Sequence, residues 1–214
     1  MSKDSLFSKK RMTLLRDPLN DSNPITVQAL GVCSALAITV QLKPAIVMAI
    51  SVMVVLSVAN VLISFMRKLI PSRIRIIVQL VVIAALVILV DEVLKAFVYD
   101  VSKELSVFVG LIITNCIIMG RLEAFGMANG PWESFLDGIG NSFGYAWILI
   151  VVAFFRELLG SGTLYGYPVL EKIGLYETGY ENNGMMILPP MALITVGIII
   201  WIQRMKNEKL IESK

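Results

Sequence analysis

The strongest constraint on this chain is a series of six long stretches that contain no Asp, Glu, Lys or Arg. These uncharged stretches are residues 25–42, 44–66, 76–90, 105–120, 138–155 and 182–203. A transmembrane helix needs about 20 apolar residues to cross about 30 Å of hydrocarbon. The third stretch is short, but it continues as an amphipathic helix to about Tyr99, because Asp91 and Lys95 can pair on one helix face. The sequence therefore predicts an all-α integral membrane protein with six transmembrane helices.

The composition excludes several classes of soluble enzyme. Hydrophobic residues make up 57% of the 214 residues and charged residues only 16%, against about 25% charged in soluble domains. The chain has no histidine, which excludes Ser/His and Cys/His catalysis, His-ligated zinc and proximal-His haem. The net charge of +3 is spread over short segments between the apolar stretches, so it predicts no nucleic-acid interface.

The basic residues predict the orientation in the membrane. The first 23 residues are polar and lack the apolar core of a signal peptide. When successive connections are assigned to alternate sides, 14 of the 19 Lys and Arg residues fall on one side. The positive-inside rule places that side in the cytoplasm, with cytoplasmic tails at residues 1–23 and 204–214. Between the tails, residues 24–104 and 105–203 each hold three of the uncharged stretches.

The two halves resemble each other, which predicts an internal repeat. The first and fourth stretches are interrupted by polar and small residues, and each carries one of the two cysteines, Cys33 and Cys116. Arg67 and Arg156 follow the second and fifth stretches in similar sequence contexts. Halves with an odd number of spans must insert with opposite orientations, so the two interrupted helices approach the middle of the membrane from opposite sides. This inverted repeat predicts that Cys33 and Cys116 lie near each other.

Three interpretations of these cysteines are open from the residues alone. A cysteine in a membrane helix is often a small packing residue. A disulfide needs Cα atoms within about 7 Å and an oxidising environment. Ligation of an iron–sulfur cluster usually takes four cysteines, so two further ligands would have to come from a second copy or from a paralogous partner.

Five sequence blocks resemble the Nqr/Rnf family, and in particular the D-subunit branch found in the Na⁺-translocating NADH:quinone oxidoreductase (Nqr). The blocks are 23–25 (NPI), 30–37 (LGVCSALA), 75–79 (RIIVQ), 105–116 (LSVFVGLIITNC) and 155–162 (FRELLGSG). The related protein of the Rnf complex, its E subunit, is expected to carry Pro-Leu after the first cysteine, where this chain has Ser34 and Ala35. Residues 120–126 (GRLEAFG) differ at two positions from the expected family string. The resemblance favours the Nqr branch over the alternative, an Rnf-type ferredoxin:NAD complex.

The resemblance implies a role as a non-autonomous subunit of an enzyme that passes electrons from NADH to quinone and exports Na⁺. It implies pairing in inverted orientation with the homologous E subunit of the complex, each chain giving two cysteines, here Cys33 and Cys116, to an intramembrane [2Fe-2S] cluster. NAD, FAD, FMN and quinone would be bound by the other Nqr subunits (A, B, C and F). The complex would lie in the bacterial inner membrane. Without the resemblance, broken helices in an inverted repeat favour a small secondary transporter.

Other residues carry weaker signals. Arg121 and Glu123 follow the fourth stretch and, with Asp137, are interpreted as part of a solvated cytoplasmic loop, with an ion path or a contact with another subunit as the alternative. Asp91 could attract Na⁺ at the outer surface, but an ion pair with Lys95 is the favoured interpretation.

Two glycines in the fifth stretch, Gly140 and Gly144, have the spacing of a small-residue helix-packing face. No strand precedes them, so they fail the fingerprint of a dinucleotide-binding loop. Pro189 and Pro190 are predicted to open the last helix, because proline is tolerated in a first helical turn.

Overall fold

The computed structural model describes most of the chain, in five segments. These are residues 9–20, 22–71, 73–97, 110–168 and 184–206.

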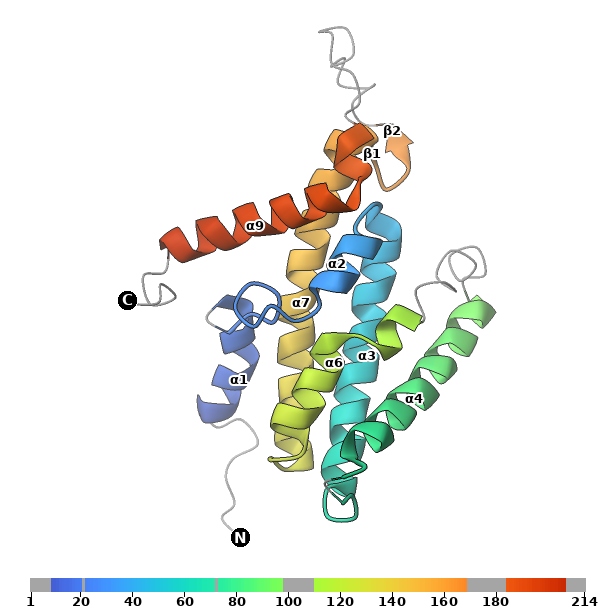
Figure 1. Cartoon of the computed structure of the whole chain (residues 1–214), viewed down its shortest axis with the longest axis vertical. Helices are drawn as coiled ribbons and strands as arrows, with labels where there is room; N and C mark the ends of the chain where they lie inside the picture. The colour runs from blue at the N-terminus through green and yellow to red at the C-terminus, as the bar shows by residue number, and fades with distance from the viewer. Residues whose placement is uncertain (1–8, 21, 72, 98–109, 169–183, 207–214) are drawn as a thin grey trace, which may run out of the picture.

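Two long helices of opposite direction form the centre of the molecule, α3 (Leu42–Met66) and α7 (Pro131–Gly160) (Figure 1). They pack side by side along their length. Small residues allow the close approach, since a Cβ atom at Gly138 would lie 2.9 Å from Ser57 Cα. Apolar side chains of both helices, such as Leu149, are fully buried and form the core. Dense packing between these helices builds the frame on which the shorter elements are placed.

An N-terminal helix, α1 (Lys9–Asn20), packs against α7 within the segment expected to be a polar tail. A Cβ atom at Gly144 would come within 2.3 Å of the Pro18 carbonyl oxygen, and one at Gly140 within 2.6 Å of that of Leu14. The packing face predicted from Gly140 and Gly144 is therefore confirmed, and its partner is α1.

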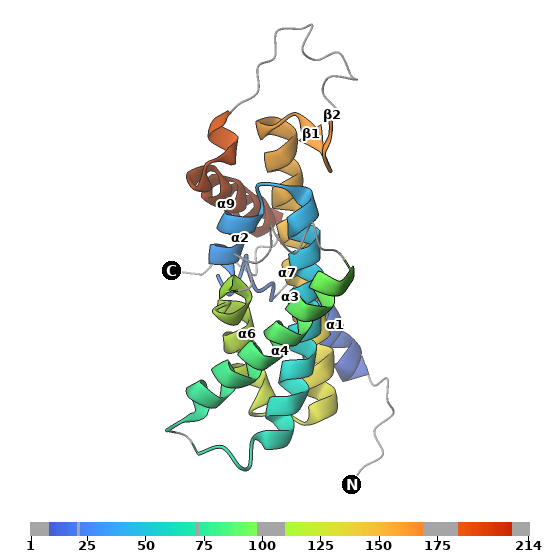
Figure 2. The ribbon, with the colours of Figure 1, turned by 90° about the vertical axis from the view of Figure 1, so that its right-hand side faces the viewer.

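Two further helices lie outside the central pair. Helix α4 (Arg75–Phe97) runs beside α3, and α9 (Pro189–Lys206) crosses the molecule near the end of α7 (Figure 2). Pro189 and Pro190 form the first turn of α9, as predicted. Helix α4 begins one residue before the predicted stretch; its predicted continuation to about Tyr99 lies partly outside the described residues.

The predicted interruption of the first stretch is present. Residues 24–31 are not helical and begin with a turn at 24–27, and the backbone of Ala29 and of Gly31 has positive φ angles of 54° and 81°. A short helix, α2 (Val32–Ile38), follows. Gly31 suits this left-handed conformation because it has no Cβ atom.

The fourth stretch is interrupted as well. Helical residues 110–113 end before Asn115, whose extended backbone opens helix α6 (Cys116–Arg121). The Asn115 side chain caps α6 by accepting a hydrogen bond from the Ile117 N–H. Helix α6 runs directly into a π-helical turn, η1 (Leu122–Gly126).

A small hairpin and a 3₁₀ turn complete the described elements. Strands β1 (Thr163–Leu164) and β2 (Tyr167–Pro168) pair antiparallel, with Thr163 opposite Pro168. The two residues between them have positive φ angles of 56° and 83°, as the tight turn of a hairpin requires. The 3₁₀ turn, η3 (Gly184–Ile187), precedes α9.

Three helices within the described segments are long and apolar enough to cross a membrane, namely α3, α4 and α7, and α9 is a shorter apolar helix. Helix α7 begins earlier than the predicted 138, because Pro131 suits its first turn and Asp137 is paired inside the protein. The six-span arrangement stays a prediction.

Candidate functional site

The two broken helices begin close together and run in opposite directions, α2 toward one end of the molecule and α6 toward the other (Figure 1). Cys33 is the second residue of α2, and Cys116 is the first residue of α6. Both thiols are free and exposed at the surface of the chain. A partner protein or an inorganic group at this surface would therefore have access to both.

Direct contacts join the two helix starts through the residues next to the cysteines. Ser34 Oγ lies 3.5 Å from Asn115 Nδ2, which donates to it. Ser34 Oγ also lies 2.7 Å from the Tyr145 hydroxyl oxygen of α7. The structure thus brings the sequence neighbours of Cys33 and Cys116 into contact, while the proximity of the two thiols themselves stays a prediction.

This donor set fits half of an iron–sulfur site. No group of three or more His, Cys, Asp or Glu residues that could hold a metal ion occurs among the described residues. Two thiols from one chain are two of the four ligands that such clusters usually take. Both thiols are exposed at the surface of the chain, so another chain could supply the remaining ligands.

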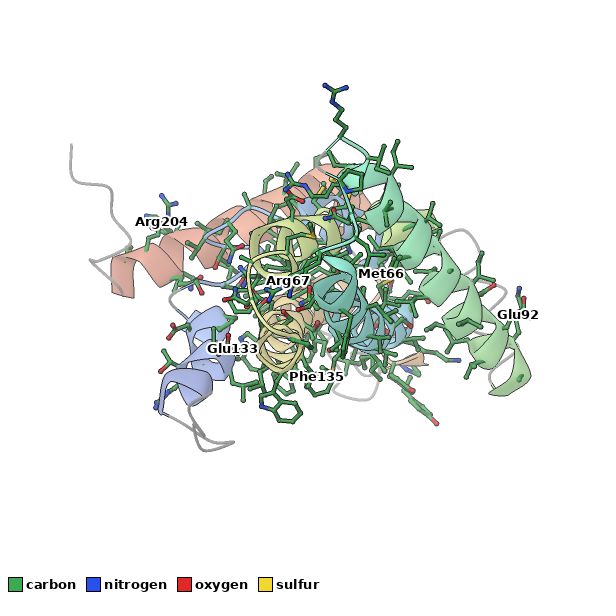
Figure 3. The ribbon with its side chains drawn as sticks, turned by 90° about the horizontal axis from the view of Figure 1, so that it is seen from below. Met66, Arg67, Glu92, Glu133, Phe135 and Arg204 are labelled. Atoms are coloured by element: carbon green, nitrogen blue, oxygen red, sulfur yellow. The ribbon has the colours of Figure 1, made fainter. Side chains whose placement is uncertain are left out.

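Two arginines bind the opposite ends of the broken helices. Arg67, which follows α3, donates to backbone carbonyls just after η1, the closer being that of Asn129 at 2.8 Å. Figure 3 views the molecule from this end, with Arg67 beside the last residue of α3. Arg156 on α7 donates to the Leu36 carbonyl oxygen at 3.3 Å and to Thr39 Oγ1 at 2.6 Å, where α2 ends. Each arginine thus contacts the opposite half of the sequence, Arg67 at the turn that follows η1 and Arg156 at the end of α2.

Arg156 and its neighbour Glu157 also fix the connection between α2 and α3. Arg156 is 1% exposed and donates further hydrogen bonds to backbone carbonyls of η3 and of the residue after it. Glu157 Oε2 accepts from the backbone N–H of Leu42 at 2.6 Å and so caps the start of α3. A buried charge with this many partners is satisfied rather than orphaned.

The interpretation of Arg121, Glu123 and Asp137 as a solvated loop is wrong. Arg121 and Asp137 form an ion pair in which the Asp137 side chain is only 2% exposed. Glu123 lies in η1, pairs with Arg75 of α4 and accepts a hydrogen bond from Gln79 at 3.0 Å. The segment is helical and packed, because its charges find partners on α4 and α7.

The pairing predicted for Asp91 is confirmed. Lys95 Nζ lies 2.7 Å from Asp91 Oδ2 and 3.0 Å from Glu92 Oε1. Glu92 is at the outer end of α4, away from the central pair of helices (Figure 3). These three residues do not meet the cysteines.

Sequence reasoning missed the contribution of Tyr145, which lies behind the cysteine-bearing turns. The signal that could have found it was a polar aromatic residue in the middle of an uncharged stretch, beside the packing glycine Gly144. A buried tyrosine hydroxyl normally has a hydrogen-bond partner, but the identity of that partner depends on the tertiary structure.

These features define a class of protein, that of helical membrane proteins in which two interrupted helices meet. The features are the long apolar helices, the two interruptions and the free thiol beside each interruption. The chain belongs to the Rnf-Nqr family. The model of this family, which is described as "Rnf-Nqr subunit, membrane protein", matches residues 11–200. The chain is thus a membrane-embedded protein.

Similar proteins agree with this assignment over nearly their whole length. The chain is 53% identical over 208 residues to the D subunit of the Na(+)-translocating NADH-quinone reductase of Photobacterium profundum, covering 97% of this chain and 98% of the relative. It is 54% identical over 201 residues to the protein of the same name from Haemophilus ducreyi, covering 94% and 96%. These relatives are named as subunits of a reductase.

Proposed function

We propose that this chain is an electron-relay subunit of a Na⁺-translocating NADH:quinone reductase, with Cys33 and Cys116 as two ligands of an intramembrane [2Fe-2S] cluster. The observation that carries the proposal is the junction of α2 and α6, where two free thiols are exposed at adjoining helix starts. The names of the full-length relatives supply the identity of the complex.

The remaining two ligands come from the homologous E subunit, bound in inverted orientation. A cluster with four thiolates cannot be completed by a chain with two cysteines. The exposure of both thiols supports completion from outside the chain. Four thiolates at membrane depth are tolerated only with iron to compensate their charge, so the two chains are expected to depend on each other.

When bound, the cluster supplies one-electron transfer at this depth. Cys33 and Cys116 would bind the cluster, and Ile117 and Ile118, which follow Cys116 and are fully buried, would keep the protein next to this ligand apolar. The NAD, FAD, FMN and quinone of the reaction are bound by the other Nqr subunits (A, B, C and F).

The architecture proposed for this role has six transmembrane helices in two inverted repeats, residues 24–104 and 105–203. Each half has a broken helix, then a long helix, then a third helix. These are α2, α3 and α4 in the first half and α6, α7 and α9 in the second. The broken helices of the two halves run in opposite directions along the molecule, and so do α3 and α7 (Figure 1). The reciprocal contacts of Arg67 and Arg156 support the same correspondence. We propose that both termini lie in the cytoplasm, on the distribution of basic residues, and that the chain lies in the bacterial inner membrane, as the resemblance to the Nqr/Rnf family implies.

Coupling to Na⁺ export is part of the proposal. Reduction changes the charge of the buried centre by one unit, which can bias the arrangement of the two three-helix halves. The candidate ion-path residues Arg121, Glu123 and Asp91 are all in ion pairs, so a role in Na⁺ passage requires those pairs to open. A Na⁺ stoichiometry unaffected by locking the oxidation state of the cluster would contradict this coupling.

The cysteine assignment is tested with Cys33→Ala and Cys116→Ala in the purified complex. Each variant is expected to lose the iron, the acid-labile sulfide and the EPR signal of one cluster while the other subunits are retained, because three thiolates do not hold the centre. The matched control is Thr114→Ala, an exposed position two residues from Cys116 whose hydroxyl donates to the Gly110 carbonyl oxygen at 3.1 Å.

The control variant is expected to keep wild-type iron and sulfide. Unchanged iron together with unchanged quinone reduction in both cysteine variants would make the cysteines packing residues. That result would favour the alternative of a small inverted-repeat secondary transporter.

A further inference from the structure

A buried group of hydrogen-bonding side chains lies directly behind the two cysteines. It consists of Tyr145 on α7, Ser34 on α2 and Asn115 at the start of α6. All three side chains are buried, and Tyr145 is 0% exposed. Ser34 is the residue after Cys33, and Asn115 is the residue before Cys116. The group therefore touches both cysteine-bearing turns and the rigid core at once.

The direction of each hydrogen bond can be assigned from the donors present. Ser34 Oγ donates its one hydrogen to the Gly31 carbonyl oxygen at 2.8 Å. The Tyr145 hydroxyl must then be the donor in its 2.7 Å contact with Ser34 Oγ. Asn115 Nδ2 donates to the same oxygen at 3.5 Å, and Asn115 Oδ1 accepts from the Ile117 N–H at 3.3 Å. Ser34 Oγ thus accepts from one side chain of α7 and from one at the start of α6.

The short contact dominates this arrangement. A 3.5 Å bond between Ser34 and Asn115 is at the weak limit, whereas 2.7 Å is the ordinary length of a strong O–H···O bond. The ring of Tyr145 also lies close to Gly31, where an added Cβ atom would come within 3.0 Å of the Tyr145 Cε2 atom. Tyr145 therefore fixes the start of α2 against a helix that is itself held by the core.

We propose that Tyr145 is a positioning residue for the two thiols, setting the separation of Cys33 and Cys116 through its hydrogen bond to Ser34. The part of this inference that concerns a cluster rests on the proposed function. The part that concerns the thiol separation does not. Groups behind a ligand orient it and tune the metal that it holds, so a change in the separation of the two sulfur atoms is expected to change the spectrum and the potential of the centre.

The first test measures the thiol separation without relying on bound iron. The intact complex is depleted of iron with a chelator, then treated with a short bismaleimide, and the Cys33–Cys116 cross-link is quantified by mass spectrometry. The assignment of a cross-link within this chain is unambiguous because the chain has only these two cysteines. Tyr145→Phe keeps the ring and removes the hydroxyl, and the matched control is Tyr165→Phe, at an exposed tyrosine of the hairpin turn.

The ratio of cross-linked to uncross-linked chain in Tyr145→Phe is expected to fall by up to about fivefold to tenfold relative to the control, since one lost buried hydrogen bond changes an equilibrium constant by that factor. Ser34→Ala removes the acceptor and is expected to produce the same fall, and the double variant no additional one. A yield equal to that of the control in both single variants would overturn the positioning role.

The second test uses the iron-loaded complex. Tyr145→Phe is expected to retain wild-type iron content while the EPR line shape and the midpoint potential change, a result that simple loss of stability does not produce. If the cysteine variants keep wild-type iron, the proposed function is wrong. A reduced cross-link yield in Tyr145→Phe would in that case still support the positioning role. If the cysteine variants lose iron but Tyr145→Phe keeps the wild-type cross-link yield, spectrum and potential, only the positioning role is wrong.

Discussion

Replacement of Arg121 by Met is expected to lower the free energy of unfolding by about 3–5 kcal/mol, because it leaves the Asp137 carboxylate buried without its charge partner. The Asp137 side chain is only 2% exposed in the ion pair, so water cannot replace the guanidinium. Asn141 Nδ2 remains within 3.0 Å of Asp137 Oδ1, but one amide does not compensate a full charge. The measurement is the thermal unfolding midpoint of the purified complex in detergent.

A double variant and a matched control make this result specific. Adding Asp137→Asn to Arg121→Met removes the second charge and is expected to recover most of the lost stability, since replacing both partners of a buried pair is often nearly neutral. Arg75→Met breaks the pair with Glu123, whose side chain is 38% exposed. Such a partly hydrated pair is worth about 0–1 kcal/mol, and equal losses in Arg75→Met and Arg121→Met would contradict the argument.

Replacement of Gly144 by Ala is expected to displace α1 from α7. The new methyl group would come within 2.3 Å of the Pro18 carbonyl oxygen, a backbone atom that cannot move without shifting the helix. Overpacking of this kind costs about 1–3 kcal/mol and more where backbone must move. The expected result is a lower unfolding midpoint and faster tryptic cleavage after Arg16, an exposed residue of α1.

Gly197→Ala on α9 is the control for the glycine substitution. A Cβ atom there meets nothing within 4 Å, and alanine is favoured over glycine in a helix by about 0.5–1 kcal/mol. This variant is therefore expected to be as stable as the wild type or slightly more stable. If Gly144→Ala resists heat and trypsin as well as Gly197→Ala does, the close packing of α1 on α7 is not present in the complex.

The sequence predicted the long helices well because their signal is local. Helices α3 and α4 begin within two residues of their uncharged stretches, since the cost of a charge in hydrocarbon limits where a spanning helix can start and end. The interruption at Gly31 was predicted for a similar reason, because glycine and short polar residues such as serine and threonine are weak helix formers wherever they occur. The small-residue face of Gly140 and Gly144 was visible from spacing alone, although its partner was not.

What only the tertiary structure decided is which distant residues meet. Arg121 and Asp137 are 16 residues apart, and Ser34 and Tyr145 are 111 apart, so no pattern along the chain pairs them. The sequence suggested an exposed loop for Arg121 because charged residues are usually solvated. The fold overrode that tendency by placing the end of α6 and the η1 turn beside α7 and α4, where each charge finds a partner.

The sequence by itself therefore determined where the chain can cross a membrane and where its helices break, since both depend on short-range chemistry. The meeting of the starts of α2 and α6 beside Tyr145 of α7 decided which side chains lie next to the two cysteines, because that depends on the path of the whole backbone.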